Sequence, residues 1–159
     1  MRPLIVCEPP ATEGARRSFR ANRAADTQPE IRLRRALWQA GLRGYRKNLK
    51  TLPGKPDIVF SKQRLAIFVH GCFWHGCKKC AQKRNLKPAA NAAYWSDKVA
   101  RNKERDRSAL RELREKGWRT LVVWECELKA DRAAVIETVA ALLECGDSAP
   151  LSNQRVSDR

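Results

Sequence analysis

The chain has 159 residues, of which 43% are hydrophobic, and this suits one domain with a single core better than two domains. Lysine and arginine number 33 against 17 acidic residues, so the formal net charge is +16. Such a charge favours a polyanionic partner, most commonly nucleic acid, and a membrane surface is a poorer match because the helices expected below bury their apolar faces in a core.

The two ends of the chain lack a clear periodic pattern. Residues 1–27 mix Pro, Arg, Ala and small polar residues and are predicted to form a mobile basic arm, whereas 146–159 are predicted to form a polar tail. The folded domain is therefore expected over 28–145. The first apolar run, residues 4–7, is too short for a secretory signal, and no run approaches the roughly 20 residues of a membrane span. We expect a cytoplasmic protein, in which clustered cysteines indicate a metal site rather than disulfides.

The segment "TQPEIRLRRALWQAG" predicts the first helix, with Pro29 in its first turn and Gly41 at its end. Three residues are expected on its apolar face: Leu33, Leu37 and Ala40. Glu30 falls on the same face by the three- and seven-residue spacing. A carboxylate on an apolar face needs a specific reason.

A hairpin is predicted next, from a strand over Asp57 to Phe60, a turn at residues 61–63 and a buried strand over Leu65 to His70. Antiparallel pairing would bring Asp57, which opens the first strand, and His70, which closes the second, to the same end of the sheet.

The remaining pattern predicts a helix, a strand and a helix. The helix runs from Trp95 to Lys116, with an inward row at three- and four-residue steps formed by Trp95, Val99, Asn102, Asp106, Leu110 and Leu113. The nearly all-apolar "RTLVVWEC" is typical of a central strand, and a last helix is expected within Asp131 to Leu143. The order of elements predicts a mixed α/β domain.

Four cysteines have the residue type and spacing of a structural zinc site: Cys72, Cys77, Cys80 and Cys126. Four thiolates complete a tetrahedral site without using a histidine. The spacing leaves a second possibility open, in which His75 completes a site with three cysteines. Cys7 and Cys145 stand apart and are expected to be free thiols.

The only two histidines of the chain, His70 and His75, lie beside this cluster. If the thiols bind zinc, both imidazoles are available for proton transfer near neutral pH. Asp57 is expected nearby through the hairpin, and Glu30 faces inward from the first helix. Two carboxylates and two histidines at one end of a sheet indicate a Mg²⁺-dependent hydrolase, although each residue alone has an ordinary structural interpretation.

Four segments in the same order give the chain a resemblance to a known family: "LPGKPDIVF", "AIFVHGCFWHGC", "YWSDKVARNKERDR" and "GWRTLVVWEC". Over residues 17–128 the sequence resembles the very short patch repair (Vsr) endonucleases of bacteria. The resemblance implies a restriction-endonuclease-like fold, with a mixed sheet flanked by helices and a structural zinc site. It also implies nicking of DNA on the 5′ side of the T in a T:G mismatch, the lesion left when 5-methylcytosine deaminates.

The resemblance also implies roles by position. Asp57 would bind the catalytic Mg²⁺, His75 would be the general base, and His70 and Glu30 would support the metal-bound water. Asn102, in "NKERD", would support the site or the DNA. The zinc ligands would be the same four cysteines.

Two positions depart from the best-known pattern of that family. Val69 stands where the pattern has Thr, which alters activity only if the hydroxyl group rather than the backbone is used. Cys77 and Cys80 stand where the pattern has His and Cys, and an all-thiolate site remains chemically complete.

The aromatic residues divide into two groups. By the resemblance, Phe73, Trp74 and Trp95 are expected to wedge into the duplex beside the mismatch, where unstacking costs less. The other tryptophans sit in the apolar pattern and are expected in the core: Trp38, Trp118 and Trp124.

The sequence therefore predicts a zinc-stabilised, Mg²⁺-dependent mismatch nicking endonuclease. Its expected partner is double-stranded DNA with a T:G mismatch, with other repair proteins as possible further partners. A single nick needs one active site, so a monomer is expected. Two alternatives stay open, namely a related restriction-type or junction nuclease, and a zinc-stabilised DNA-binding module without catalysis.

Overall fold

The computed structural model describes residues 25–80 and 92–145. Of the predicted mobile arm, 1–27, residues 1–24 lie outside the described residues, as does the predicted polar tail, 146–159. Residues 25–27 are described, and Asp26 and Thr27 hydrogen-bond to Glu30. In the described ranges, none of the helices combines the length and the apolar character needed to cross a membrane.

The first described helix, α2, spans Gln28–Gln39, as the sequence predicted. The Glu30 carboxylate caps its N-terminus, because Glu30 Oε1 accepts from the Thr27 backbone N–H at 3.3 Å and from the Thr27 hydroxyl at 2.7 Å. Leu33, Ala36 and Leu37 are buried.

Two expectations about α2 are wrong. Ala40 is exposed rather than buried, because the helix ends at Gln39 and Ala40 is already its C-cap. Trp38 is 56% exposed rather than in the core. It follows Leu37 directly, and a single helical step of about 100° turns its side chain away from the buried row.

The sheet has four strands in the order β1, β2, β3, β4: Arg46–Lys47, Ile58–Phe60, Leu65–His70 and Arg119–Trp124. The β1/β2 and β2/β3 pairs are antiparallel, which confirms the predicted hairpin, and β3/β4 is parallel. The expectation of a central position for β4 is wrong, since within the described residues it lies at the edge of the sheet. Its apolar run instead reflects helices on both faces of the sheet, because side chains that point to either face then contact a helix and are apolar.

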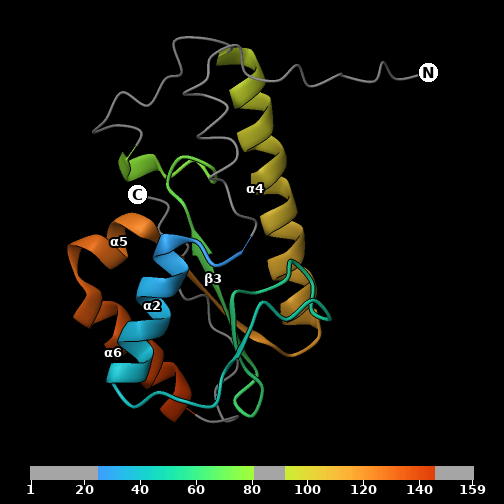
Figure 1. Cartoon of the computed structure of the whole chain (residues 1–159). Helices are drawn as coiled ribbons and strands as arrows, with labels where there is room; N and C mark the ends of the chain where they lie inside the picture. The colour runs from blue at the N-terminus through green and yellow to red at the C-terminus, as the bar shows by residue number, and fades with distance from the viewer. Residues whose placement is uncertain (1–24, 81–91, 146–159) are drawn as a thin grey trace.

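Helices cover the sheet on both sides, as Figure 1 shows. The long helix α4, Ala92–Glu115, lies on one face, and α2 lies on the other with α5, Glu125–Ala130, and α6, Arg132–Glu144. The last helix was predicted, whereas the six-residue α5 was not. The result is a mixed α/β sandwich.

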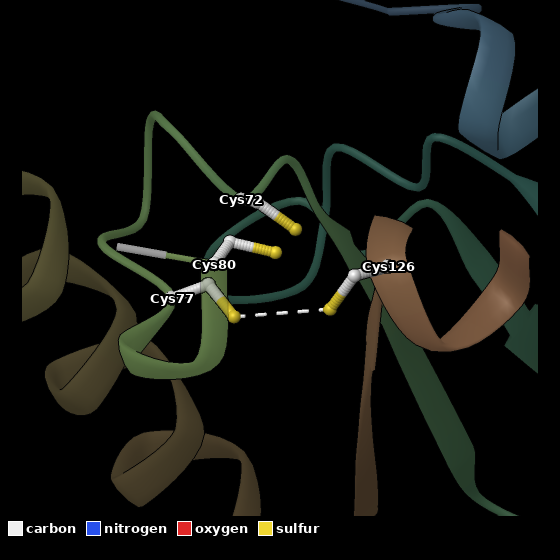
Figure 2. Close-up of side chains that lie close together, drawn as sticks. All are labelled: Cys72, Cys77, Cys80 and Cys126. Carbon is white, nitrogen blue, oxygen red and sulfur yellow. Dashed lines mark hydrogen bonds between the residues drawn. The ribbon is translucent and has the colours of Figure 1, made fainter. Parts of the chain in front are cut away.

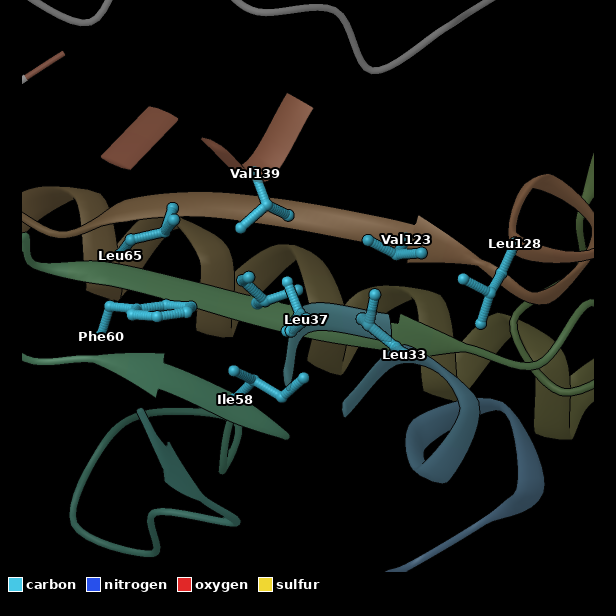
Figure 3. Close-up of a cluster of buried hydrophobic side chains, with 9 residues drawn as sticks. Leu33, Leu37, Ile58, Phe60, Leu65, Val123, Leu128 and Val139 are labelled. Atoms are coloured by element: carbon cyan, nitrogen blue, oxygen red, sulfur yellow. The ribbon is translucent and has the colours of Figure 1, made fainter. Parts of the chain in front are cut away.

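Alternation along β3 divides the core into two layers. Leu65 and Ile67 pack into the larger cluster with α2, α5 and α6, which is drawn in Figure 3. Ala66 and Phe68 pack on the other side, against Leu113 of α4. Because side chains alternate with a period of two, His70 falls on the α4 side of the sheet.

Candidate active site and metal centre

The predicted meeting of Asp57 and the end of β3 is present in the structure. Asp57 precedes β2, and its Oδ2 accepts a hydrogen bond from the Val69 backbone N–H at 2.7 Å. Val69 supplies a main-chain group here, which any residue other than proline could supply. The substitution of valine for threonine at this position therefore leaves the contact to Asp57 intact.

Both histidines lie at this end of the sheet. The His70 and His75 rings stack with 3.9 Å between centroids and an interplanar angle of 9°. His75 Nδ1 lies 2.6 Å from Asp106 Oδ2, and His70 Nε2 lies 3.9 Å from the same oxygen. If Nδ1 of His75 carries the proton that Asp106 accepts, Nε2 keeps a free lone pair, which is the tautomer that a general base requires.

Sequence reasoning assigned no site role to Asp106. It placed this residue in the inward row of the long helix without asking what the carboxylate would contact. The available signal was its position one helical turn after Asn102, on the face that carries the residues expected at the site.

Burial shifts the pKa values of two groups, His70 and Asp57, in opposite directions. It lowers the pKa of His70 to about 4, with the nearby His75 adding to the shift and Asp106 opposing it. His70 is thus neutral at neutral pH. Burial raises the pKa of Asp57 to about 6, and the charge of Glu30 adds to this, whereas the Val69 hydrogen bond, Arg34 and His75 act against it. Perturbed groups of this kind are typical of functional sites.

Glu30 is 4% exposed on the inner face of α2. Its carboxylate accepts from Thr27 and from the Asp26 backbone N–H, and Arg34 Nη1 lies 3.6 Å from its Oε2. Capping and this ion pair therefore account for a carboxylate on an apolar face. Glu30 acts on Asp57 through its charge. Within the described residues, Glu30 makes no direct contact with His70 or His75.

Asn102 contacts the loop that follows β3 rather than the reactive side chains. Its Nδ2 donates to the Trp74 carbonyl oxygen at 2.9 Å, and its Oδ1 accepts from Arg105. Asn102 therefore holds the main chain next to His75.

The three aromatic residues expected at the DNA form one cluster. Ring centroids lie 5.1 Å apart for Phe73 and Trp74, 5.3 Å for Phe73 and Trp95, and 5.5 Å for Trp74 and Trp95. Lys98 Nζ lies 5.4 Å from the Trp74 ring and 5.3 Å from the Trp95 ring. Phe73, Trp74 and Trp95 are half-buried, so the cluster keeps part of its surface available beside the active site.

Figure 2 shows that the four predicted cysteines point toward one another, three from the loop after β3 and Cys126 from α5. Their sulfur atoms all lie within 4.8 Å of one another, and Cys77 and Cys126 are 3.8 Å apart. Tetrahedral zinc with bonds of about 2.3 Å requires sulfur atoms about 3.8 Å apart, whereas a disulfide requires about 2.05 Å. The donor set therefore fits zinc. His75 belongs to a separate group with His70 and Asp106, so the three-cysteine alternative is not favoured.

Burial raises the pKa of Cys126 to about 11, and it also raises the pKa of Cys72. Thiolates crowded this closely need a cation to remain ionised at neutral pH. Cys145 is an exposed free thiol, as expected, and Cys7 lies outside the described residues.

A hard cation also has a suitable ligand in Asp57. Mg²⁺ usually retains several water molecules and binds through one or two carboxylates, and the raised pKa of Asp57 reflects a buried carboxylate that a cation would stabilise. Within the described residues Asp57 is not part of a close group of three ligands, so its metal would depend on water and substrate for the remaining coordination.

A family model described as DNA mismatch endonuclease Vsr matches residues 11–82 of the chain. "DNA mismatch endonuclease Vsr" of Escherichia coli (strain K12) is 39% identical over 136 residues, covering 84% of this chain and 85% of the relative. "Type II nicking enzyme V.NaeI" of Lentzea aerocolonigenes is 43% identical over 136 residues, covering 82% and 79%. "Type II nicking enzyme V.NmeAIP" of Neisseria meningitidis serogroup A is 45% identical over 104 residues, covering 65% and 71%.

The fold and these relatives define a hydrolytic nuclease of restriction-endonuclease-like architecture. The chain belongs to the Vsr family of DNA mismatch endonucleases.

Proposed function

We propose that this protein is a Mg²⁺-dependent DNA endonuclease that nicks on the 5′ side of the T in a T:G mismatch. The observation that carries the proposal is the contact of His75 with Asp106 at the end of the sheet where Asp57 lies. A carboxylate that orients an imidazole, next to a second carboxylate able to hold a metal, is a suitable arrangement for attack of water on a phosphodiester.

Each group has a separate role in this proposal. Asp57 would hold Mg²⁺, which would supply positive charge to neutralise the scissile phosphate. His75 accepts a proton from the attacking water at Nε2, because Asp106 occupies its Nδ1. His70 stays neutral and orders water near the metal, and the charge of Glu30 favours a cation at Asp57.

Substrate recognition is assigned to the aromatic cluster of Phe73, Trp74 and Trp95. These rings would enter the stack beside the mismatch, where unstacking costs less than in matched DNA. Asn102 holds the Trp74 backbone and so connects this cluster to His75. The four-cysteine site would hold zinc and fix the loop that carries both groups.

The proposal also covers the setting of the reaction. Residues 28–145 form the catalytic domain, and the preceding basic residues add affinity for DNA. The protein acts as a monomer in the bacterial cytoplasm, on nucleoid DNA, and other repair proteins act after the nick.

The test is single-turnover cleavage of labelled duplexes that are matched, carry one T:G mismatch, or are branched, each with and without Mg²⁺. The wild type should nick only the T strand of the mismatch. Asp57→Ala, His75→Ala and Asp106→Asn should each slow nicking by roughly 10²-fold or more, the usual range for a general base and its support. Glu115→Gln, an exposed carboxylate on the helix of Asp106, is the matched control and should leave the rate unchanged.

Other outcomes point to other functions. Preferential cutting of matched or branched DNA would replace the proposed substrate with that of a restriction-type or junction nuclease. Tight binding without cleavage in any duplex would indicate a non-catalytic DNA-binding module. Trp74→Ala protein that still distinguished the mismatch as well as wild type would remove the role of the aromatic cluster.

A further inference from the structure

An open groove of about 430 Å³ lies between α2 and β1, and its lining includes none of the catalytic residues or of the four clustered cysteines. Its basic lining residues are Arg34, Arg35 and Lys47, and its aromatic lining residues are Trp38 and Tyr45. None of the described residues that line it is acidic. We call it the α2–β1 groove.

The groove has positive charge available for a ligand. Arg34 uses its guanidinium on Asp26 and Glu30. Within residues 25–80 and 92–145, by contrast, the side chains of Arg35 and Lys47 have no ion-pair or hydrogen-bond partner. The groove therefore suits an anion.

Trp38 makes the groove more selective among anionic ligands than a surface with basic residues alone. Among the large hydrophobic side chains of the described residues it is the exposed one, at 56%. The Arg43 guanidinium carbon lies 4.3 Å from the centroid of its ring. An exposed aromatic ring surrounded by cations is the combination used to bind single-stranded nucleic acid, because bases stack on the ring and phosphates contact the cations. An acidic peptide would use the charges but has no equal need of the ring.

The groove begins at the edge of the active site. Lys47 pairs with Ile58 in the sheet, and the next residue, Asn48, donates its N–H to the Asp57 carbonyl oxygen at 3.1 Å. From Glu30, α2 reaches Trp38 after about 12 Å at a rise of about 1.5 Å per residue. That length corresponds to roughly three or four phosphates if the strand keeps the stacked spacing of about 3.4 Å that it has in a duplex, and to fewer in a more extended strand.

We propose that the α2–β1 groove binds a short unpaired segment of the nicked strand where it leaves the active site. Arg35 and Lys47 contact its phosphates, and a base stacks on Trp38. The identity of this strand rests on the proposed function, because a nick beside a mismatch creates a strand end that is weakly paired. The segment 1–24 is a poorer occupant, since its arginines outnumber its acidic residues and would be repelled.

The experiment measures binding of the full-length protein by fluorescence anisotropy. The probes are a labelled 12-nucleotide oligothymidylate, a nicked duplex with a four-nucleotide unpaired flap at the nick, and a labelled deca-glutamate peptide. The variants are Trp38→Ala, Trp38→Phe and the double change Arg35→Glu with Lys47→Glu. Lys116→Glu, an exposed cation at the end of α4, is the matched charge control, and thermal unfolding verifies that each variant folds.

We expect Trp38→Ala to weaken binding of the oligothymidylate and of the flapped duplex by about tenfold, from the loss of one stacked base. Trp38→Phe should retain most of the affinity, and the double variant should lose affinity and part of the salt dependence. The Lys116→Glu control should bind both DNA probes as tightly as the wild type. First-turnover nicking of a short T:G duplex should proceed at the wild-type rate in every variant.

Wild-type affinity for both DNA probes in Trp38→Ala would overturn the proposal. So would tighter binding of deca-glutamate than of oligothymidylate that depends on Trp38, which would make the groove a docking site for an acidic protein segment. If the wild type failed to nick T:G duplexes yet bound oligothymidylate through Trp38, the proposed function would fail and the groove would stand as a single-strand site.

Discussion

Asp57 is a residue at which function and stability oppose each other. Its buried carboxyl has a pKa of about 6, against 3.8 for the free side chain. A carboxyl whose pKa is raised in the folded state stabilises the fold fully below the unfolded pKa, and this contribution is lost as the pH rises through 6. The ionised form that a metal needs is therefore the form that the metal-free fold disfavours.

His70 has the opposite effect on stability over nearly the same range of pH. Its pKa falls from 6.5 to about 4 on folding, so the fold loses stability as the pH drops from 6.5 toward 4. The two contributions partly cancel in the wild type. A comparison with a variant at Asp57 is therefore needed to separate them.

Asp57→Asn should stabilise the metal-free protein at pH 7.5 while abolishing nicking, because asparagine keeps an oxygen for the Val69 N–H without the buried charge. The expected gain in the free energy of unfolding is roughly 1 to 3 kcal/mol, since one pKa unit corresponds to about 1.4 kcal/mol. Urea unfolding at pH 7.5 and pH 4.5 measures it, and the gain should shrink at the lower pH. A variant less stable than wild type at pH 7.5 would contradict this account of Asp57.

At the scale of elements, residues 71–80, which follow β3, bring the catalytic and cysteine groups together. His75 and Cys77 flank Gly76, whose φ is +64°. A Cβ atom at this glycine would lie 2.6 Å from Lys103 Cε and 2.8 Å from Val99 Cγ1 of α4. The loop can thus rest on α4, and present His75 to Asp106, because residue 76 has no side chain.

Zinc at the cysteine site should hold this loop to α5. Cys77→Ser is expected to lower bound zinc from one per chain to well below half and to lower the melting temperature by roughly 10 °C or more, because binding of structural zinc contributes directly to folding. Metal analysis and calorimetry measure the two effects. Cys145→Ser changes an exposed cysteine outside the cluster and should change neither. Zinc-free wild type that unfolded at the same temperature would show that the metal has no structural role.

The turn before β2 packs closely on α4. Gly54 has φ +71°, and a Cβ atom there would lie 2.6 Å from Ala109 Cβ. Gly44 has φ +86° and nothing within 4 Å of the same position. The two glycines share a left-handed backbone and differ in the space around them.

Gly44→Ala should therefore cost about 1 kcal/mol, from the backbone conformation alone. Gly54→Ala should cost roughly 1 to 3 kcal/mol more, because the turn and α4 must move apart. Denaturant unfolding of both variants gives the difference directly. Equal losses would mean that the contact of the turn with α4 is easily rearranged.

At the scale of the whole molecule, the net charge of +16 dominates association with a polyanion. If about six phosphates are contacted, affinity for a T:G duplex should fall about 10³-fold between 50 and 200 mM salt. Anisotropy titrations at four salt concentrations measure the slope of log affinity against log salt. A slope near zero would mean that the excess charge does not face the DNA.

The sequence by itself determined the α2, β2, β3, α4, β4 and α6 elements, the inward position of Glu30 and the grouping of the cysteines. These follow from local rules, since helix periodicity, strand alternation and ligand spacing are encoded by neighbouring residues. The position of β4 at the edge was not predictable, because its apolar run reports contact with helices on both faces and not which strands are its neighbours in the sheet.

Only the tertiary structure decided which side chains meet across the molecule. Asp106 contacts His75 over 31 positions of sequence, and Trp38 proved to lie beside Tyr45 and Lys47 in a basic groove rather than in the core. Such contacts depend on how α4 packs on the sheet and on how α2 packs beside β1. Docking is set by long-range packing of whole faces, which the residues near Asp106 or Trp38 in the sequence do not specify.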